Sequence, residues 1–102
     1  MGKLPGILER DVVKKIRERL RRYPETYHFV KEAKSLRGIP DLIICKRGTF
    51  IALEVKRSAA EVKARGAKLQ AWNIEEITKA GGYAYFIYPE NMEEIFSIID
   101  NL

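Results

Sequence analysis

Two short β-rich runs joined by a tight turn constrain this chain more than any other feature. Residues 41–45 and 50–56 are rich in β-branched and other apolar side chains, and residues 46–49 between them include Gly48. This pattern predicts a β-hairpin. Because side chains alternate along a strand, both faces of the hairpin are apolar, and we expect both to be covered. The hairpin therefore belongs in the middle of a layered α/β fold.

Periodic patterns on either side of the hairpin predict the remaining elements. Apolar residues recur at helical or strand spacing in five further segments, and two pairs, Ser58 with Glu61 and Asn91 with Glu94, have the spacing of capping boxes. The segments are a helix over 7–22, a weaker strand over 27–33, a helix over 67–80, a strand over 83–88 and a last helix that opens at Asn91. The expected order is α-β-β-β-α-β-α.

Length and composition indicate one domain over residues 1–102. The chain has 102 residues, of which 46% are hydrophobic and 32% charged, so it can bury one modest core. Its longest apolar stretches, such as 83–88, are too short to cross a bilayer, and we expect no membrane partner. Cys45 is the only cysteine, which excludes disulfides and cysteine-rich zinc sites and favours a reducing cytoplasmic setting.

Basic side chains are concentrated near the N-terminus. Residues 1–37 hold 11 basic and 5 acidic side chains, whereas residues 81–102 hold no basic and 4 acidic ones, and the net charge is +5. A polyanion is the partner that such a gradient favours, although a solvated helix face would have the same composition. The candidate nucleic-acid-binding residues are Lys14, Arg17 and Arg21, on one stripe of the first helix, and Lys31, Lys34 and Arg37.

The register of the hairpin brings two carboxylates together. If the strands fold symmetrically about Arg47 and Gly48, Asp41 stands opposite Glu54, and Lys56 points to the same face as Glu54, about 7 Å further along. Opposed like charges are destabilising unless something neutralises them. A divalent cation such as Mg²⁺, held by two carboxylate oxygens and water, would do so. Alternatively, these are ordinary charges at the ends of strands.

Two helical residues point toward the same region. At about 100° per residue, Glu9 falls within the apolar stripe of the first helix, and Gln70 shares an inward face with Ile74 and Ile77. For Glu9, the alternative is a favourable interaction with the helix macrodipole. For Gln70, it is a side chain satisfied by the neighbouring backbone.

These residues together carry a resemblance to a known family. The string Gly38-Ile39-Pro40-Asp41, then Glu54-Val55-Lys56, then Gln70, resembles the virus-type replication-repair nuclease (VRR-NUC) family of the PD-(D/E)XK nuclease superfamily. The resemblance covers nearly the whole chain. It implies a restriction-endonuclease-like αβββαβ core, in which a central mixed β-sheet is flanked by helices.

The resemblance also implies roles for the site residues. Asp41 and Glu54 would hold Mg²⁺, for which Mn²⁺ can substitute, with the Val55 carbonyl and Glu9 as further ligands. Lys56 would act on the attacking water, either as a base or by stabilising negative charge. Gln70 would orient that water or contact the phosphate.

We therefore expect a metal-dependent, structure-selective DNA endonuclease that hydrolyses phosphodiester bonds. By the same resemblance, its substrate is branched DNA such as a four-way (Holliday) junction. We expect a homodimer, because two-fold symmetry would place two sites on two strands, and a cytoplasmic setting in a bacterial or phage-infected cell. Two alternatives stay open: a nuclease of the same fold that acts on flaps, nicks or single strands, and a non-catalytic nucleic-acid- or protein-binding module.

Overall fold

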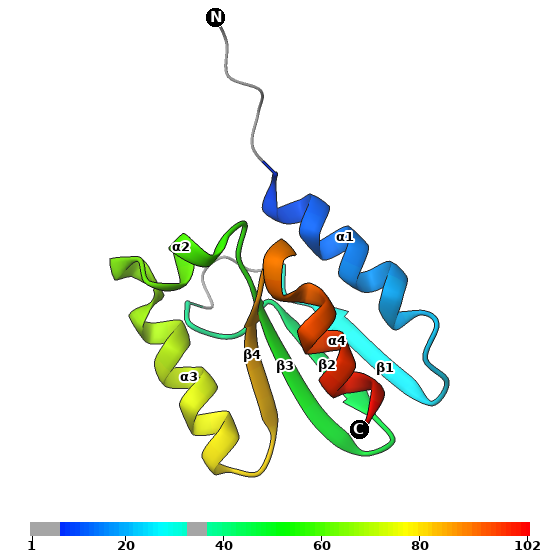
Figure 1. Cartoon of the computed structure of the whole chain (residues 1–102). Coiled ribbons are helices and arrows are strands. Elements are labelled where there is room, and N and C mark those ends of the chain that lie inside the picture. Colours follow the sequence, from blue (N-terminus) through cyan, green and yellow to red (C-terminus); the bar gives the residue numbers. More distant parts are fainter. Residues whose placement is uncertain (1–6, 33–36) are drawn as a thin grey trace, which may run out of the picture.

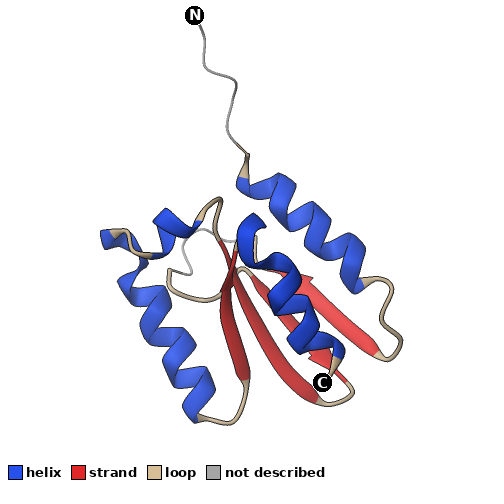
Figure 2. Ribbon diagram, viewed as in Figure 1, coloured by secondary structure: helices blue, strands red, loops and turns tan. Residues whose placement is uncertain are grey.

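The computed structural model describes residues 7–32 and 37–102, which form a mixed α/β fold (Figures 1 and 2). A four-stranded sheet has the order β1-β2-β3-β4, in which β1, β2 and β3 are antiparallel and β4 runs parallel to β3. The strands are β1 (Thr26–Val30), β2 (Leu42–Lys46), β3 (Thr49–Val55) and β4 (Tyr83–Ile87). The helices are α1 (Glu9–Leu20), α2 (Ala59–Val62), α3 (Lys68–Lys79) and α4 (Met92–Asp100), with 3-10 turns η1 (Arg65–Ala67) and η2 (Pro89–Asn91).

The predicted hairpin forms with the predicted register. Arg47 and Gly48 have φ angles of 52° and 84°, as a two-residue turn between right-twisted strands requires. Cys45 pairs with Phe50 and Ile43 with Ala52, so the residue just before β2, Asp41, comes opposite Glu54.

The first face of the sheet, which includes Leu42, Ile44, Ile51 and Leu53, is closed. Helices α1 and α4 lie across it (Figure 1), and these four strand residues are 0% exposed. The core cluster they form also contains Val12, Ile16 and Leu20 of α1 and Ile95, Phe96 and Ile99 of α4. This cluster supplies the apolar burial on which a domain of this size depends.

The second face of the sheet is covered only in part. Helix α3 runs along β4 (Figure 1), and Ala52 and Ala84 on this face are buried. On β1, farther from α3, Phe29 is 50% exposed and Tyr27 70%, and Phe50, near the C-terminal end of α3, is still 44% exposed. The prediction that both faces of the hairpin are covered is therefore wrong for this face, because α3 reaches only the strands next to it.

The order of the main elements is as predicted, but neither of the two predicted capping boxes forms. At the start of α2, Ser58 makes no side-chain cap, and the Glu61 carboxylate accepts the backbone N–H of Arg57 at 2.7 Å. At the last helix, the turn η2 begins one turn earlier than expected. The side chain of Asn91 therefore accepts the N–H of Tyr88 at 2.8 Å.

No helix among the described residues is both long and apolar enough to cross a bilayer.

Substitutions at two glycines with nearly equal φ angles measure how tightly the loop before Asp41 is packed. Gly38 and Gly48 have φ angles of 81° and 84°, but a Cβ on Gly38 would lie 2.5 Å from Cγ of Leu69, whereas one on Gly48 would meet nothing within 4 Å. We expect Gly48→Ala to cost about 1 kcal/mol of unfolding free energy, from the positive φ alone. Gly38→Ala should cost about 1–3 kcal/mol more, from crowding against α3. Equal losses in urea unfolding would show that α3 does not hold this loop.

Candidate active site

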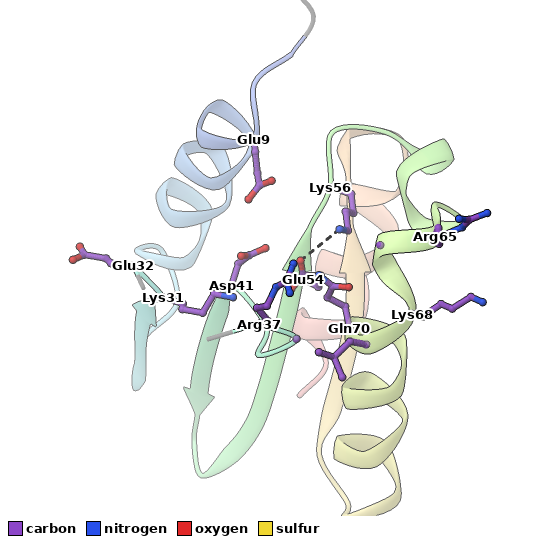
Figure 3. A pocket seen from close by; sticks show the side chains of 13 residues that line it. Glu9, Lys31, Glu32, Arg37, Asp41, Glu54, Lys56, Arg65, Lys68 and Gln70 are labelled. Atoms are coloured by element: carbon purple, nitrogen blue, oxygen red, sulfur yellow. Dashed lines mark ion pairs between the residues drawn. The ribbon is translucent and has the colours of Figure 1, made fainter. Parts of the chain in front are cut away.

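A pocket of about 650 Å³ opens where β2 begins and β3 ends, between the second face of the sheet and the start of α3 (Figure 3). Its walls come from segments far apart in the sequence. Among the residues that the sequence analysis singled out, those lining the pocket are Glu9, Lys31, Arg37, Asp41, Glu54, Lys56 and Gln70. Folding therefore brings together all four of the predicted catalytic residues.

Asp41 is held on both sides by backbone groups. Its Oδ2 accepts the N–H of Val55 at 2.8 Å, and its carbonyl oxygen accepts the N–H of Lys31 at 2.7 Å. These bonds join Asp41, the residue just before β2, to the chain after β1 on one side and to β3 on the other. The carboxylate is thus fixed across the hairpin beside Glu54, on a rigid part of the sheet.

Glu54 is a buried carboxylate with too few hydrogen bonds and positive charges around it to offset the loss of its hydration. It is 5% exposed, and its Oε1 is buried with no hydrogen-bond partner among the described residues. Burial, and next the charge of Asp41, raise the pKa of Glu54 to about 8, although Lys56 acts in the opposite direction. An orphaned acceptor of this kind costs free energy unless a cation or donor meets it.

Lys56 and Gln70 complete the inner wall. The Nζ of Lys56 lies 3.7 Å from Oε2 of Glu54, and the Lys56 side chain is 16% exposed. Hydrogen bonding assigns the Gln70 amide nitrogen to the carbonyl of Gly66, 2.7 Å away. The neighbouring backbone therefore satisfies the amide nitrogen of Gln70, as the alternative interpretation held.

Glu9 approaches the pair from α1. It lies in the first turn of that helix with its carboxylate directed toward Asp41 (Figure 3). Although its side chain is exposed, partial desolvation and then the charge of Asp41 raise the pKa of Glu9. The helix thus places an acid beside the pocket, as its position in the apolar stripe predicted.

The donor set suits a hard divalent cation. Within residues 7–32 and 37–102, no three Asp, Glu, His or Cys side chains form a compact ligand cluster. Asp41 and Glu54 are instead a pair, and two carboxylates with water are what Mg²⁺ usually takes from a protein. The orphaned Oε1 of Glu54 is the atom such an ion would satisfy. Ligation by Glu9 or by the Val55 carbonyl stays a prediction.

Basic residues flank the acidic pair on two sides. Lys31 and Arg37 line one wall. Arg65 and Lys68, which the sequence analysis missed, belong to the wall formed by η1 and α3, and their side chains point outward from it (Figure 3). Their only sequence signal is that they precede Gln70 by five and two residues. The basic stripe of α1 does not line this pocket.

That stripe lies along β1. Lys14, Arg17 and Arg21 are exposed, and Nε of Arg17 donates to Nε2 of His28 at 3.4 Å. Lys34, the remaining predicted DNA-binding residue, lies outside the described residues.

Comparisons with known proteins leave this site to be interpreted from its own chemistry. No protein-family model, curated protein or solved structure matches the chain.

The raised pKa of Glu54 predicts how the metal-free protein responds to pH. In the folded state Glu54 keeps its proton up to about pH 8, whereas the ordinary pKa is 4.5. The unfolded chain therefore binds fewer protons between these values, and stability falls as pH rises through this window, by up to about 1.4 kcal/mol per pH unit from this group. Urea unfolding in EDTA from pH 5 to pH 8.5 measures the slope.

Glu54→Gln provides the control for this pH dependence. The variant keeps the shape of the side chain but cannot ionise, so its stability should fall less steeply with pH. The remaining slope includes Glu9, whose pKa is also raised. Parallel profiles for the two proteins would contradict the assignment to Glu54.

Proposed function

We propose that this protein is a metal-dependent DNA endonuclease of the PD-(D/E)XK superfamily, with the VRR-NUC family as its nearest type. The observation that carries the proposal is the buried Glu54 carboxylate, whose Oε1 has no hydrogen-bond partner among the described residues, facing Asp41 across a hairpin. Lys56 beside it and basic residues on both walls of the pocket are the groups that phosphodiester hydrolysis requires.

The architecture is compatible with a restriction-endonuclease-like core. The elements α1, β1, β2, β3, α3 and β4 follow one another in αβββαβ order, and the sheet is mixed, with β4 parallel to β3. The acidic pair comes from the antiparallel hairpin, and the glutamine comes from the crossover helix α3 that leads to β4. This agreement supports the proposed family without depending on any single motif.

Asp41 and Glu54 would hold the metal ion, Mg²⁺ or Mn²⁺. An ion bound there would polarise a phosphoryl oxygen and acidify a water molecule. Asp41 is suited to this role because the Val55 N–H holds its Oδ2 in place, and Glu54 because burial leaves its Oε1 in need of positive charge. Glu9 lies beyond Asp41, where it can hold a water molecule near the pair.

Lys56 and Gln70 would act directly on the reacting groups. The Lys56 ammonium, 3.7 Å from Glu54, can stabilise the negative charge that grows on the phosphate oxygens as water attacks. The amide oxygen of Gln70 can accept a hydrogen bond from that water and so orient it. Arg37 would hold a phosphate beside the cleaved bond, and Arg65, whose side chain points outward from η1, would hold one farther along the backbone (Figure 3).

The substrate we propose is branched DNA. The basic side chains that line the pocket suit the DNA backbone, which they can bind without reading the bases. A homodimer would direct two such sites at two strands, as a symmetric four-way junction requires. Flaps, nicks and single strands are the competing substrates.

Cleavage assays on labelled four-way junction, flap, nicked, single-stranded and duplex DNA test the proposal. We expect cleavage with Mg²⁺ or Mn²⁺ and none in EDTA. Asp41→Asn and Glu54→Gln should each lower the rate by at least about a hundredfold, because the bound ion supplies several kcal/mol of transition-state stabilisation. DNA binding should persist, since a negative charge is removed.

Glu32→Gln is the matched control for these variants. It removes one negative charge from the same pocket but from a residue that lies outside the opposed pair. We expect near-normal cleavage. Full activity of Asp41→Asn, or of the normal protein in EDTA, would refute the metal site, and binding without cleavage of any DNA would favour the non-catalytic module.

The two basic surfaces should differ in their contribution to DNA affinity. If phosphates are bound in the pocket, replacing Arg37, Arg65 and Lys68 together by Ala should flatten the slope of log affinity against log salt by about 0.9 for each phosphate that the variant no longer neutralises. The corresponding replacement of Lys14, Arg17 and Arg21 measures the stripe on α1. An unchanged slope in the pocket variant and a reduced slope in the stripe variant would place the DNA on α1.

A further inference from the structure

An exposed apolar patch continues from the pocket along the second face of the sheet. The strand register sets its layout. Asp41 stands opposite Glu54; in the next row on this face, Phe29 pairs with Ile43 and Ile43 with Ala52.

A further row holds Tyr27, Cys45 and Phe50, which pair with one another in the same way. Successive rows on one face are about 7 Å apart, so the two rows lie directly beyond the acidic pair. We call Tyr27, Phe29, Ile43, Cys45 and Phe50 the aromatic patch.

The aromatic patch is uncovered and uncharged. Tyr27 is 70% exposed, Phe29 50% and Phe50 44%, and the two rows contain no charged side chain. Contiguous exposed apolar surface on a small domain marks a place where something binds. Three rings, two on β1 and one on β3 with β2 between them, are unusual in such a surface because most exposed apolar residues occur singly.

Charge favours a nucleic-acid strand over a second copy of the chain as the occupant. The chain carries a net charge of +5, which attracts a polyanion, and the homodimer proposed above can form through another surface. Lys31, Arg37, Arg65 and Lys68 gather positive charge at the pocket, at one end of the patch. A strand whose backbone follows the pocket would lay its bases over the patch, and every base has a π-face that stacks on an aromatic ring.

We propose that unpaired bases of a DNA strand stack on Tyr27, Phe29 and Phe50 while the strand's backbone is held in the adjacent pocket. This proposal rests on the proposed nuclease function, and it names the substrate class as DNA with unpaired nucleotides next to the cleaved phosphate. Paired duplex cannot use the patch, because its bases already stack on one another. The open end of a flap or the centre of a branched junction can.

Binding in EDTA tests the proposal without requiring cleavage. The affinity of the protein for a fluorescein-labelled 20-nucleotide single strand is measured by anisotropy, beside a duplex of the same length and a single strand that carries abasic sugars in the middle. The test variant is Tyr27→Leu with Phe29→Leu, which keeps the patch apolar but removes two rings. The control is Tyr83→Leu, since Tyr83 is 38% exposed and lies on the first face.

We expect the double variant to lose about tenfold or more in affinity for the single strand, since each stacked base contributes about 1–3 kcal/mol. Its affinity for duplex and its thermal stability should change little. The abasic strand should bind the normal protein about as weakly as the normal strand binds the double variant. Tyr83→Leu should bind like the normal protein.

Three results would overturn the proposal: equal affinity of the double variant and the normal protein for the single strand, equal affinity for normal and abasic strands, or no binding of the single strand. The first of these results can be accompanied by sedimentation that shows a dimer of the normal protein. If Tyr27→Ala with Phe29→Ala then disrupts this dimer and Tyr27→Leu with Phe29→Leu preserves it, the patch is an apolar protein interface. Stacking without cleavage would refute the nuclease proposal alone, and cleavage without stacking would refute this one alone.

Discussion

The antiparallel register of β2 and β3 is the constraint on which the rest of this structure depends. It sets Asp41 opposite Glu54 and lets the Asp41 carboxylate accept the Val55 N–H at 2.8 Å, across the hairpin. A shift of one residue would turn Glu54 and every apolar residue of its strand to the opposite face. The same register therefore builds both the core and the acidic pair, and neither can change without the other.

Burial of Glu54 is the energetic cost of this arrangement. A carboxylate that is 5% exposed, with one oxygen unpartnered among the described residues and a second acid opposite, destabilises the metal-free fold whenever it ionises. The stability that tolerates this cost lies on the first face, where α1 and α4 enclose an apolar cluster that includes the fully buried Phe96. Core and site are thus separated by the thickness of one sheet.

The uncovered part of the second face follows from geometry. An α-helix with its side chains is about 10–12 Å wide, whereas neighbouring strands are about 4.8 Å apart, so one helix covers about two strands. In the part of the chain that the structure describes, the first face has α1 and α4, but the second face has only α3, which lies along β4. Rings on β1 and the turn end of the hairpin therefore stay exposed, next to the pocket.

Local rules were sufficient to predict the hairpin, its register, the order of the elements and the convergence of Asp41, Glu54 and Lys56, because a two-residue turn and strand alternation act over only a few residues. Helical spacing likewise predicted that Glu9 and Gln70 turn toward the site. Tertiary packing alone decided the rest: the depth at which Glu54 is buried, the basic wall of Arg65 and Lys68, and the exposed rings of the second face. These features depend on where α3 docks and how many strands it reaches, which no local pattern in the sequence specifies.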